Sequence, residues 1–206
     1  MKLTWANQIT ILRILLIAPF VIIMLKAGNA DDGRTMRYAA FLIFLFMCVS
    51  DVLDGYVARV KKQTTRLGAF LDPLADKLLI TCACILLARA DTAVSGFILP
   101  PTIVVLIIGK DLFLLLGFIM IHLTTGVVHV VPHFTGKLGT FLQSLMVGAI
   151  LVAPEVSLVF SRWIYVLRLL WWSAGTVAVV ATFVYIRHGM HYIEGFEETE
   201  NNRKNL

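Results

Sequence analysis

The sequence predicts an all-α integral membrane protein, and its composition and apolar pattern are the observations that predict it. Hydrophobic residues make up 59% of the 206 residues and charged residues only 15%, and the mean hydropathy is +0.85. A soluble domain of this size has about 45–50% apolar and about 25% charged residues. This excess of apolar residues is too large for one buried core, so the lipid bilayer is the expected solvent.

The apolar residues fall into runs that predict about six transmembrane helices in one bundle. Each run is long enough to cross about 30 Å of hydrocarbon as a helix. The runs are continuous and do not alternate with polar residues, which favours helices over the strands of a barrel. The predicted spans cover residues 8–26, 38–60, 69–90, 97–121, 138–160 and 163–186.

The domain organisation predicted from these runs is simple. Residues 1–193 are expected to form one membrane domain, and residues 194–206 a polar C-terminal tail. Residues 28–33 and 126–132 read as connections, and Pro100-Pro101 as the start of the fourth span. Lys2 and the first apolar run imitate a signal peptide, but Arg13 interrupts that run, so we expect a retained first span.

The formal net charge of +5 would suggest a nucleic-acid partner in a soluble protein. Here the basic residues gather near the ends of apolar runs, which fits anionic lipid headgroups, and we expect no nucleic-acid partner. Six spans place both termini and the connections after spans two and four on one side. Basic residues in short loops favour the cytoplasm for that side, by eight residues to five. The eight are Lys2, Lys61, Lys62, Arg66, Lys137, Arg187, Arg203 and Lys204, and the five are Lys26, Arg34, Arg37, Arg89 and Arg162.

Four aspartates interrupt the second and third predicted spans. Asp51 and Asp54 are three residues apart, and Asp72 and Asp76 are four apart, so each pair shares one helix face. Both pairs lie toward the span ends that meet at one short basic connection. The sequence therefore predicts that the four carboxylates converge near the cytoplasmic side of the bilayer.

The cost of these charges points to a bound cation. Each charged side chain inside a span costs about 2.5–3.5 kcal/mol on insertion scales, and four like charges also repel one another. Carboxylate ligands suit hard ions such as Mg²⁺, Mn²⁺ or Ca²⁺, and Mg²⁺ often couples carboxylates to substrate phosphates. An ion-paired helix bundle is the alternative, in which Asp51 or Asp54 pairs with Arg59 or Arg13.

These residues carry a resemblance to a known family. Asp51, Asp54-Gly55, Ala58-Arg59, Gly68, Asp72 and Asp76 reproduce, over 26 residues, the signature of the CDP-alcohol phosphatidyltransferase family. Asn7, Thr10 and Arg13 resemble that family's amino-terminal Asn, Thr and Arg. Gly136-Lys137, Thr140 and Gln143 resemble its Gly-Lys-x-x-Thr-x-x-Gln stretch.

The resemblance implies an enzyme of phospholipid biosynthesis that moves a phosphatidyl group from CDP-diacylglycerol to an alcohol and releases CMP. It implies two divalent ions, Mg²⁺ or Mn²⁺, a homodimer, and a cell (inner) membrane location with the active site facing the cytoplasm. The implied metal ligands are Asp51, Asp54, Asp72 and Asp76, with Asp76 also as the catalytic base. The implied CDP-binding residues are Asn7, Thr10, Gly55, Ala58, Arg59 and Gly68.

The residues leave two acceptor alcohols open. Two branches of the family look most similar, one with glycerol 3-phosphate as acceptor and one with phosphatidylglycerol. The first branch carries Arg-Glu and a second Arg where this chain has Lys110-Asp111 and Phe118, and Arg suits a free phosphate best. We favour glycerol 3-phosphate, with Lys110, Lys137 and Arg187 as acceptor-binding residues.

A transporter and a non-catalytic membrane scaffold are the alternatives from other classes. A transporter also places carboxylates inside a bundle, but it is expected to show broken helices in paired repeats, which this sequence lacks. A scaffold predicts no CMP release.

Overall fold

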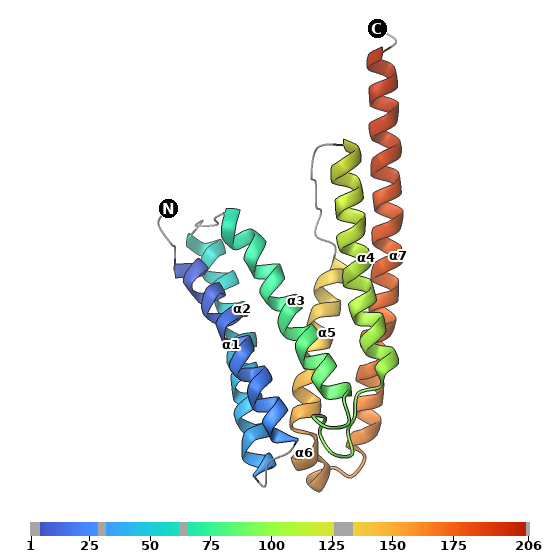
Figure 1. Cartoon of the computed structure of the whole chain (residues 1–206). Helices are drawn as coiled ribbons and strands as arrows, with labels where there is room; N and C mark the ends of the chain where they lie inside the picture. Colours follow the sequence, from blue (N-terminus) through green and yellow to red (C-terminus); the bar gives the residue numbers. More distant parts are fainter. Residues whose placement is uncertain (1–4, 29–31, 62–65, 126–133, 205–206) are drawn as a thin grey trace.

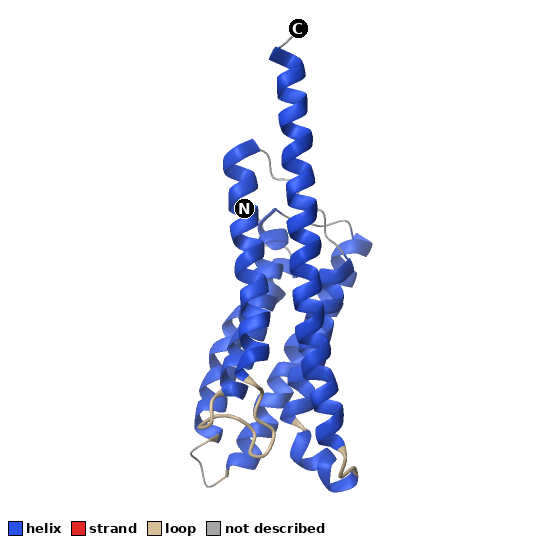
Figure 2. Cartoon of the chain, turned by 90° about the vertical axis from the view of Figure 1, so that its right-hand side faces the viewer, coloured by secondary structure: helices blue, strands red, loops and turns tan. Residues whose placement is uncertain are grey.

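A computed structural model describes residues 5–28, 32–61, 66–125 and 134–204. Only the backbone is described for residues 5–7, 54–61, 66–70, 118, 121–125, 134–135 and 191–204. Within these ranges every regular element is a helix, as Figure 2 shows, and the predicted all-α class is confirmed. The helices are α1 (Trp5–Ala27), α2 (Gly33–Lys61), α3 (Arg66–Ala88), α4 (Pro101–Thr125), α5 (Phe134–Leu151), α6 (Ala153–Val159) and α7 (Trp163–Lys204).

The helices form two groups joined by α3 (Figure 1). In the first group α1 packs against both α2 and α3, and in the second α4 and α5 pack against α7. Helix α3 also contacts α4 and α5, which links the groups. Helix α1 is therefore the element from which side chains reach α2 and α3 together.

The fourth apolar run was predicted at residues 97–121, with Pro100-Pro101 as the start of the span. Helix α4 begins at Pro101, which confirms that start, and residues 97–100 precede the helix. Proline suits the first position of a helix because its missing N–H has no partner there. Residues before it run without helix, and the Leu99 N–H donates to the Leu87 carbonyl over 3.0 Å.

The fifth predicted span, residues 138–160, is wrong as one straight helix. It breaks at Val152 into α5 and α6, whose axes differ by 71°. Pro154 explains the break, because its ring clashes with the carbonyl four residues earlier and it has no N–H to donate. Helix α6 therefore turns across the end of the bundle.

Three helical segments in the described part of the chain are long and apolar enough to cross a membrane: Gln8–Ala27, Gly33–Leu53 and Trp163–Met190. The bent pair α5 and α6 makes a fourth if it is one span. Helix α3 has the length, but it carries Asp72, Asp76 and Lys77. The protein is thus a multi-pass membrane protein, and the residues that the structure describes give three to four spans by length and composition, against the six predicted.

The core is apolar and joins both helix groups. Phe20 of α1 packs on Phe44 of α2, with ring centroids 6.1 Å apart. On the other side, a Cβ added to Gly175 of α7 would lie 3.1 Å from Ile103 Cδ1 of α4, so this glycine permits close helix packing. This tight apolar packing in the centre of the bundle holds the neighbouring polar residues in place.

The predicted polar tail continues α7. This helix runs to Lys204, whereas its apolar segment ends at Met190. Figure 1 shows the last turns of α7 extending beyond the other helices. Residues 194–204 are therefore a helical extension, and their separation as a tail rests on polarity alone.

Candidate active site

Helix α1 presents a buried polar face to the carboxylate-bearing helices. Thr10 and Arg13 are three residues apart, so they share one face of α1, and only 1% and 2% of their surfaces are exposed. A buried arginine in an apolar helix is costly unless a partner offsets its charge. This face therefore predicts partners on α2 and α3.

The partner of Arg13 on α2 is Asp51. The Nη1 atom of Arg13 lies 2.6 Å from Asp51 Oδ1, and this bond joins residues 38 positions apart. The Arg13 side chain is 1% exposed and that of Asp51 46%, so the carboxylate keeps one side open while the guanidinium is enclosed. The ion pair expected in the alternative interpretation is thus present for Asp51.

The partner of Thr10 on α3 is Asp72. The Thr10 hydroxyl donates to Asp72 Oδ1 over 2.5 Å. One face of α1 thereby orients a carboxylate on each of two neighbouring helices. Thr10 was predicted to bind CDP; in the structure its hydroxyl proton is directed at Asp72.

Asp76 lies one turn after Asp72 and is only partly exposed. Its carboxylate accepts no hydrogen bond and forms no ion pair with the described side chains, yet it lies within electrostatic range of Asp51, Arg13 and Asp111. Asp76 is therefore the carboxylate whose oxygens stay available for a proton or a ligand.

Next to Asp76, three charged residues form a compact cluster. The Asp111 carboxylate of α4 pairs with Lys77 of α3 and with Lys110 of α4, whose Nζ lies 2.9 Å from Asp111 Oδ1. Lys110 is only 5% exposed. Two ammonium groups share one carboxylate, so the cluster keeps one excess positive charge beside Asp76.

The other predicted acceptor residues lie elsewhere on the surface. Lys137 of α5 and Arg187 of α7 are exposed. Their helices meet nearby, because a Cβ added to Gly136 would lie 2.7 Å from the Tyr185 hydroxyl. Of the three predicted residues, only Lys110 lies in the cluster with Lys77 and Asp111.

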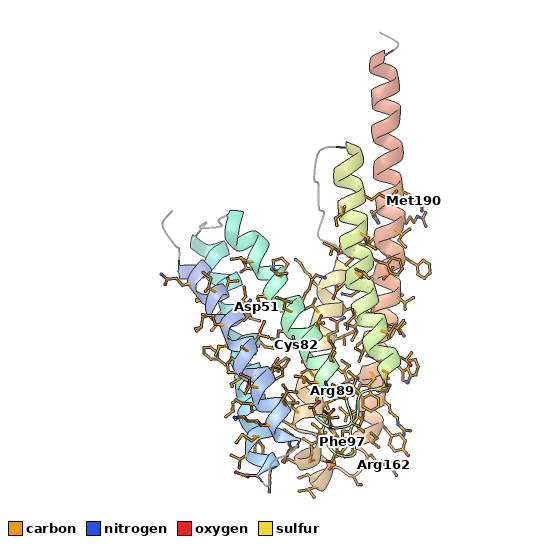
Figure 3. All side chains as sticks on the ribbon, viewed as in Figure 1. Asp51, Cys82, Arg89, Phe97, Arg162 and Met190 are labelled. Atoms are coloured by element: carbon orange, nitrogen blue, oxygen red, sulfur yellow. The ribbon has the colours of Figure 1, made fainter. Side chains whose placement is uncertain are left out.

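Several predicted site residues have no described side chain. Asn7 lies on α1, Asp54, Gly55, Ala58 and Arg59 lie on α2, and Gly68 lies on α3. Their helices bring these positions to the same end of the bundle as Asp51, which Figure 3 labels far from Arg89 and Arg162. Their contacts lie outside the described residues.

The described oxygen ligands fit a hard cation in their chemistry. Asp51 and Asp72 each use Oδ1 for the contact with α1, and the Oδ2 atoms accept no hydrogen bond from described residues. Among the described side chains, no three carboxylate, histidine or cysteine groups gather closely enough to form a metal centre. The predicted four-carboxylate convergence includes Asp54, whose side chain is not described.

Sequence reasoning missed two features of this region. Asp111 was read only as one of a pair with Lys110, because nothing in the sequence indicates that a residue 34 positions away, Lys77, shares its carboxylate. Gln143, which the sequence singled out only as part of the Gly-Lys-x-x-Thr-x-x-Gln stretch, is 2% exposed, and its Nε2 has no hydrogen-bond partner within the described residues. That burial and unpaired nitrogen were not predicted.

Comparisons with known proteins show the family to which this chain belongs. The profile of the CDP-alcohol phosphatidyltransferase family matches residues 3–187. The chain is 37% identical over 153 residues to the CDP-diacylglycerol--glycerol-3-phosphate 3-phosphatidyltransferase of Bacillus subtilis, covering 71% of this chain and 75% of that protein. It is 31% identical to a probable phosphatidylglycerophosphate synthase of Mycobacterium tuberculosis (strain H37Rv), covering 94% and 85%. A cardiolipin synthase (CMP-forming) of Rattus norvegicus is 28% identical, covering 74% and 53%.

Proposed function

Because this chain belongs to the CDP-alcohol phosphatidyltransferase family, we propose that it transfers the phosphatidyl group of CDP-diacylglycerol to glycerol 3-phosphate. The enzyme would then be a phosphatidylglycerophosphate synthase, as the bacterial relatives are named. Family membership sets aside the transporter and scaffold alternatives.

One observation carries the proposed reaction: α1 orients Asp51 and Asp72 through Arg13 and Thr10, while Asp76 keeps its carboxylate available. Positioned carboxylates of this kind are what a phosphoryl-type transfer needs, because its catalysis depends on placement and charge stabilisation. Burial of Arg13 and Thr10 fixes their rotamers, which limits motion of the two carboxylates.

In the proposed reaction, Asp76 is the proton acceptor. Asp76 takes the proton of the acceptor hydroxyl, and that oxygen attacks the phosphorus that bears diacylglycerol. A new phosphorus–oxygen bond forms, the bond to the CMP oxygen breaks, and CMP leaves with the electron pair. A placed base of this kind contributes typically 10²–10⁴-fold to the rate.

We assign two divalent metal ions to Asp51, Asp54, Asp72 and Asp76. Bound there, the metal would neutralise charge on the pyrophosphate of the substrate. The Oδ2 atoms of Asp51 and Asp72 are the described ligand atoms, since their Oδ1 atoms bond α1. Gly55, Ala58, Arg59 and Gly68, together with Asn7, remain the proposed CDP-binding positions.

The excess charge of the Lys77–Asp111–Lys110 cluster supports glycerol 3-phosphate as acceptor. Its two ammonium groups share one carboxylate beside Asp76, and they can pair with a phosphate monoester. Lys137 and Arg187 stay proposed acceptor residues at the surface, where they can attract an anion before it reaches the cluster.

A cardiolipin synthase activity, with phosphatidylglycerol as acceptor, is the second candidate. The observation that favours it is Phe118, which stands where the first branch has a second arginine. The rat relative named cardiolipin synthase also aligns with this chain, although the chain covers only 53% of that protein.

We propose that α1, α2, α3, α4, the bent pair α5–α6, and α7 are six spans. Their lengths support this, because the 23 residues of α3 and 25 of α4 make helices of about 35 Å. The balance of basic residues supports a cell (inner) membrane orientation with the carboxylate end in the cytoplasm. A homodimer is proposed from the family resemblance.

The test is CMP release by the purified protein with CDP-diacylglycerol and Mg²⁺, given each acceptor in turn. Turnover with glycerol 3-phosphate supports the synthase that we propose. Turnover with phosphatidylglycerol alone would establish the second candidate, and turnover with neither would refute both acceptors. A Lys110→Met variant, compared with Lys26→Met at the other end of the bundle, tests the charge cluster in the same assay.

A further inference from the structure

A cavity lies at the end of the bundle opposite the aspartates. Its volume is about 460 Å³, within the range of about 300–1,000 Å³ that is typical of small-ligand sites. The walls come from the end of α1, the start of α2, the connection between α3 and α4, and α6. In Figure 3 the labels Arg89 and Phe97 flank that connection, far from Asp51. Along α2 alone, Arg34 and Asp51 are separated by about 25 Å.

The described lining of this cavity has more basic than acidic residues. Arg37 donates from Nη2 to Glu155 Oε1 and from Nη1 to the Leu151 carbonyl, and its side chain is only 11% exposed. Arg34 reaches the same Glu155 oxygen, with its Nε 3.6 Å away, and is 68% exposed. Two guanidinium groups therefore share one carboxylate oxygen, which leaves one positive charge in the lining.

Tyr38 holds the two arginines side by side. The Arg34 and Arg37 guanidinium carbons lie 5.7 Å and 5.6 Å from the centre of its ring. Cation–π contact accounts for this arrangement, but it does not neutralise the charge. Arg37 is occupied by its two bonds within the protein. Arg34 donates from Nη2 to the Tyr38 hydroxyl over 3.4 Å, but its side chain is 68% exposed, so it is the guanidinium more accessible to a ligand.

The end of α1 packs closely against the α3–α4 connection, which forms one wall of this cavity. Gly28 follows α1, and a Cβ added to it would lie 1.7 Å from the Asp91 carbonyl oxygen. Any larger residue at position 28 would push the α3–α4 connection away. The nearby charges of Arg89 and Asp91 neutralise each other, with Arg89 Nη2 2.6 Å from Asp91 Oδ2. The positive charge of Arg34 is thus not offset from that side.

One wall is apolar and exposed. Leu158 of α6 lines the cavity and is 84% exposed, and its neighbour Val159 is 93% exposed. Since α6 turns by 71° from α5, these side chains lie across the end of the bundle. A positive cavity next to an exposed apolar helix suits a ligand with an anionic headgroup and acyl chains.

We propose that this cavity binds a phosphate group through Arg34, with the Arg37–Glu155 pair as its rigid floor, and that an anionic phospholipid supplies the phosphate. A guanidinium binds phosphate oxygens in pairs, which an ammonium cannot do. Free phosphate offers the same chemistry, and the experiment separates the two sources. The site differs from the proposed active site in its residues and in its end of the bundle.

The experiment measures thermal unfolding of the purified full-length protein in neutral detergent. Phosphatidylglycerol, phosphatidylcholine or inorganic phosphate is added in increasing amounts to wild type, Arg34→Gln and Arg162→Gln. Arg162 is an exposed arginine at the same end of the bundle that does not line the cavity, so its variant makes the same charge change elsewhere. Arg34→Lys serves as a second variant that keeps the charge and loses the fork.

We expect phosphatidylglycerol to raise the Tm of wild type and Arg162→Gln more than phosphatidylcholine does. Arg34→Gln should need about fivefold more phosphatidylglycerol for the same rise, and Arg34→Lys an intermediate amount. A rise with inorganic phosphate that depends on Arg34 would support the phosphate site with a soluble source. Equal responses of wild type and Arg34→Gln to both ligands would overturn the proposal. CMP release, expected to be within about twofold of wild type in Arg34→Gln, reports separately on the proposed function.

Discussion

Thr10 of α1 donates a hydrogen bond from its hydroxyl to Oδ1 of Asp72 on α3, over 2.5 Å. The two residues are 62 positions apart, and Thr10 is 1% exposed. The bond makes α1 a support for the carboxylates of the neighbouring helices. The predictions below follow from this support and from the charges around it.

Replacing Thr10 with valine removes the hydroxyl and keeps the shape of the side chain. A hydrogen bond to a charged group contributes about 1.5–3 kcal/mol, so we expect kcat/KM to fall roughly 10- to 100-fold. CMP release at varied CDP-diacylglycerol measures this. Thr182→Val is the matched control, because among the described residues Thr182 bonds the Ala178 carbonyl of its own helix and no other helix. An equal loss in both variants would contradict a specific role for Thr10.

The Arg13–Asp51 pair should couple energetically. We expect a double-mutant cycle with Arg13→Met and Asp51→Asn to give a coupling free energy of roughly 0.5–3 kcal/mol, because either single change removes this ion pair. Reversible unfolding in mixed micelles measures the four proteins. A coupling near zero would show that the pair contributes nothing to stability.

Asp76→Asn should remove the proton acceptor and preserve the size of the side chain. We expect CMP release to fall about 10²–10⁴-fold while the Tm changes little, since the Asp76 carboxylate bonds no described side chain. Asp91→Asn, an exposed carboxylate in the connection after α3, is the control for charge loss. Turnover near that of wild type in Asp76→Asn would refute the base assignment.

Losing one positive charge of the Lys77–Asp111–Lys110 cluster should weaken acceptor binding. In Lys77→Met we expect KM for glycerol 3-phosphate to rise about tenfold, while KM for CDP-diacylglycerol stays within about twofold. Steady-state kinetics with each substrate varied in turn separates the two. A rise in both KM values would point to a structural role for the cluster.

The sequence predicted the helical class and the position of most helices, because continuous apolar runs have one stable form in lipid. The start of α4 at Pro101 was predicted from its two prolines, whereas Pro154 broke the predicted fifth span, since the length of an apolar run does not show where a proline interrupts it. The aspartate spacing predicted which carboxylates share a face. The sequence offered the Arg13–Asp51 pair only as an alternative. It did not predict that Thr10 bonds Asp72, nor that Lys77 and Lys110 share Asp111, because those contacts depend on how separate helices pack.

The most direct test of metal-dependent phosphatidyl transfer is CMP release by the purified protein with CDP-diacylglycerol and glycerol 3-phosphate, before and after chelation by EDTA. We predict that turnover stops with EDTA, returns when Mg²⁺ or Mn²⁺ is added in excess, and yields one phosphatidylglycerol phosphate for each CMP. Turnover that persists unchanged after complete chelation, or CMP release without a phosphatidyl product, would contradict the account.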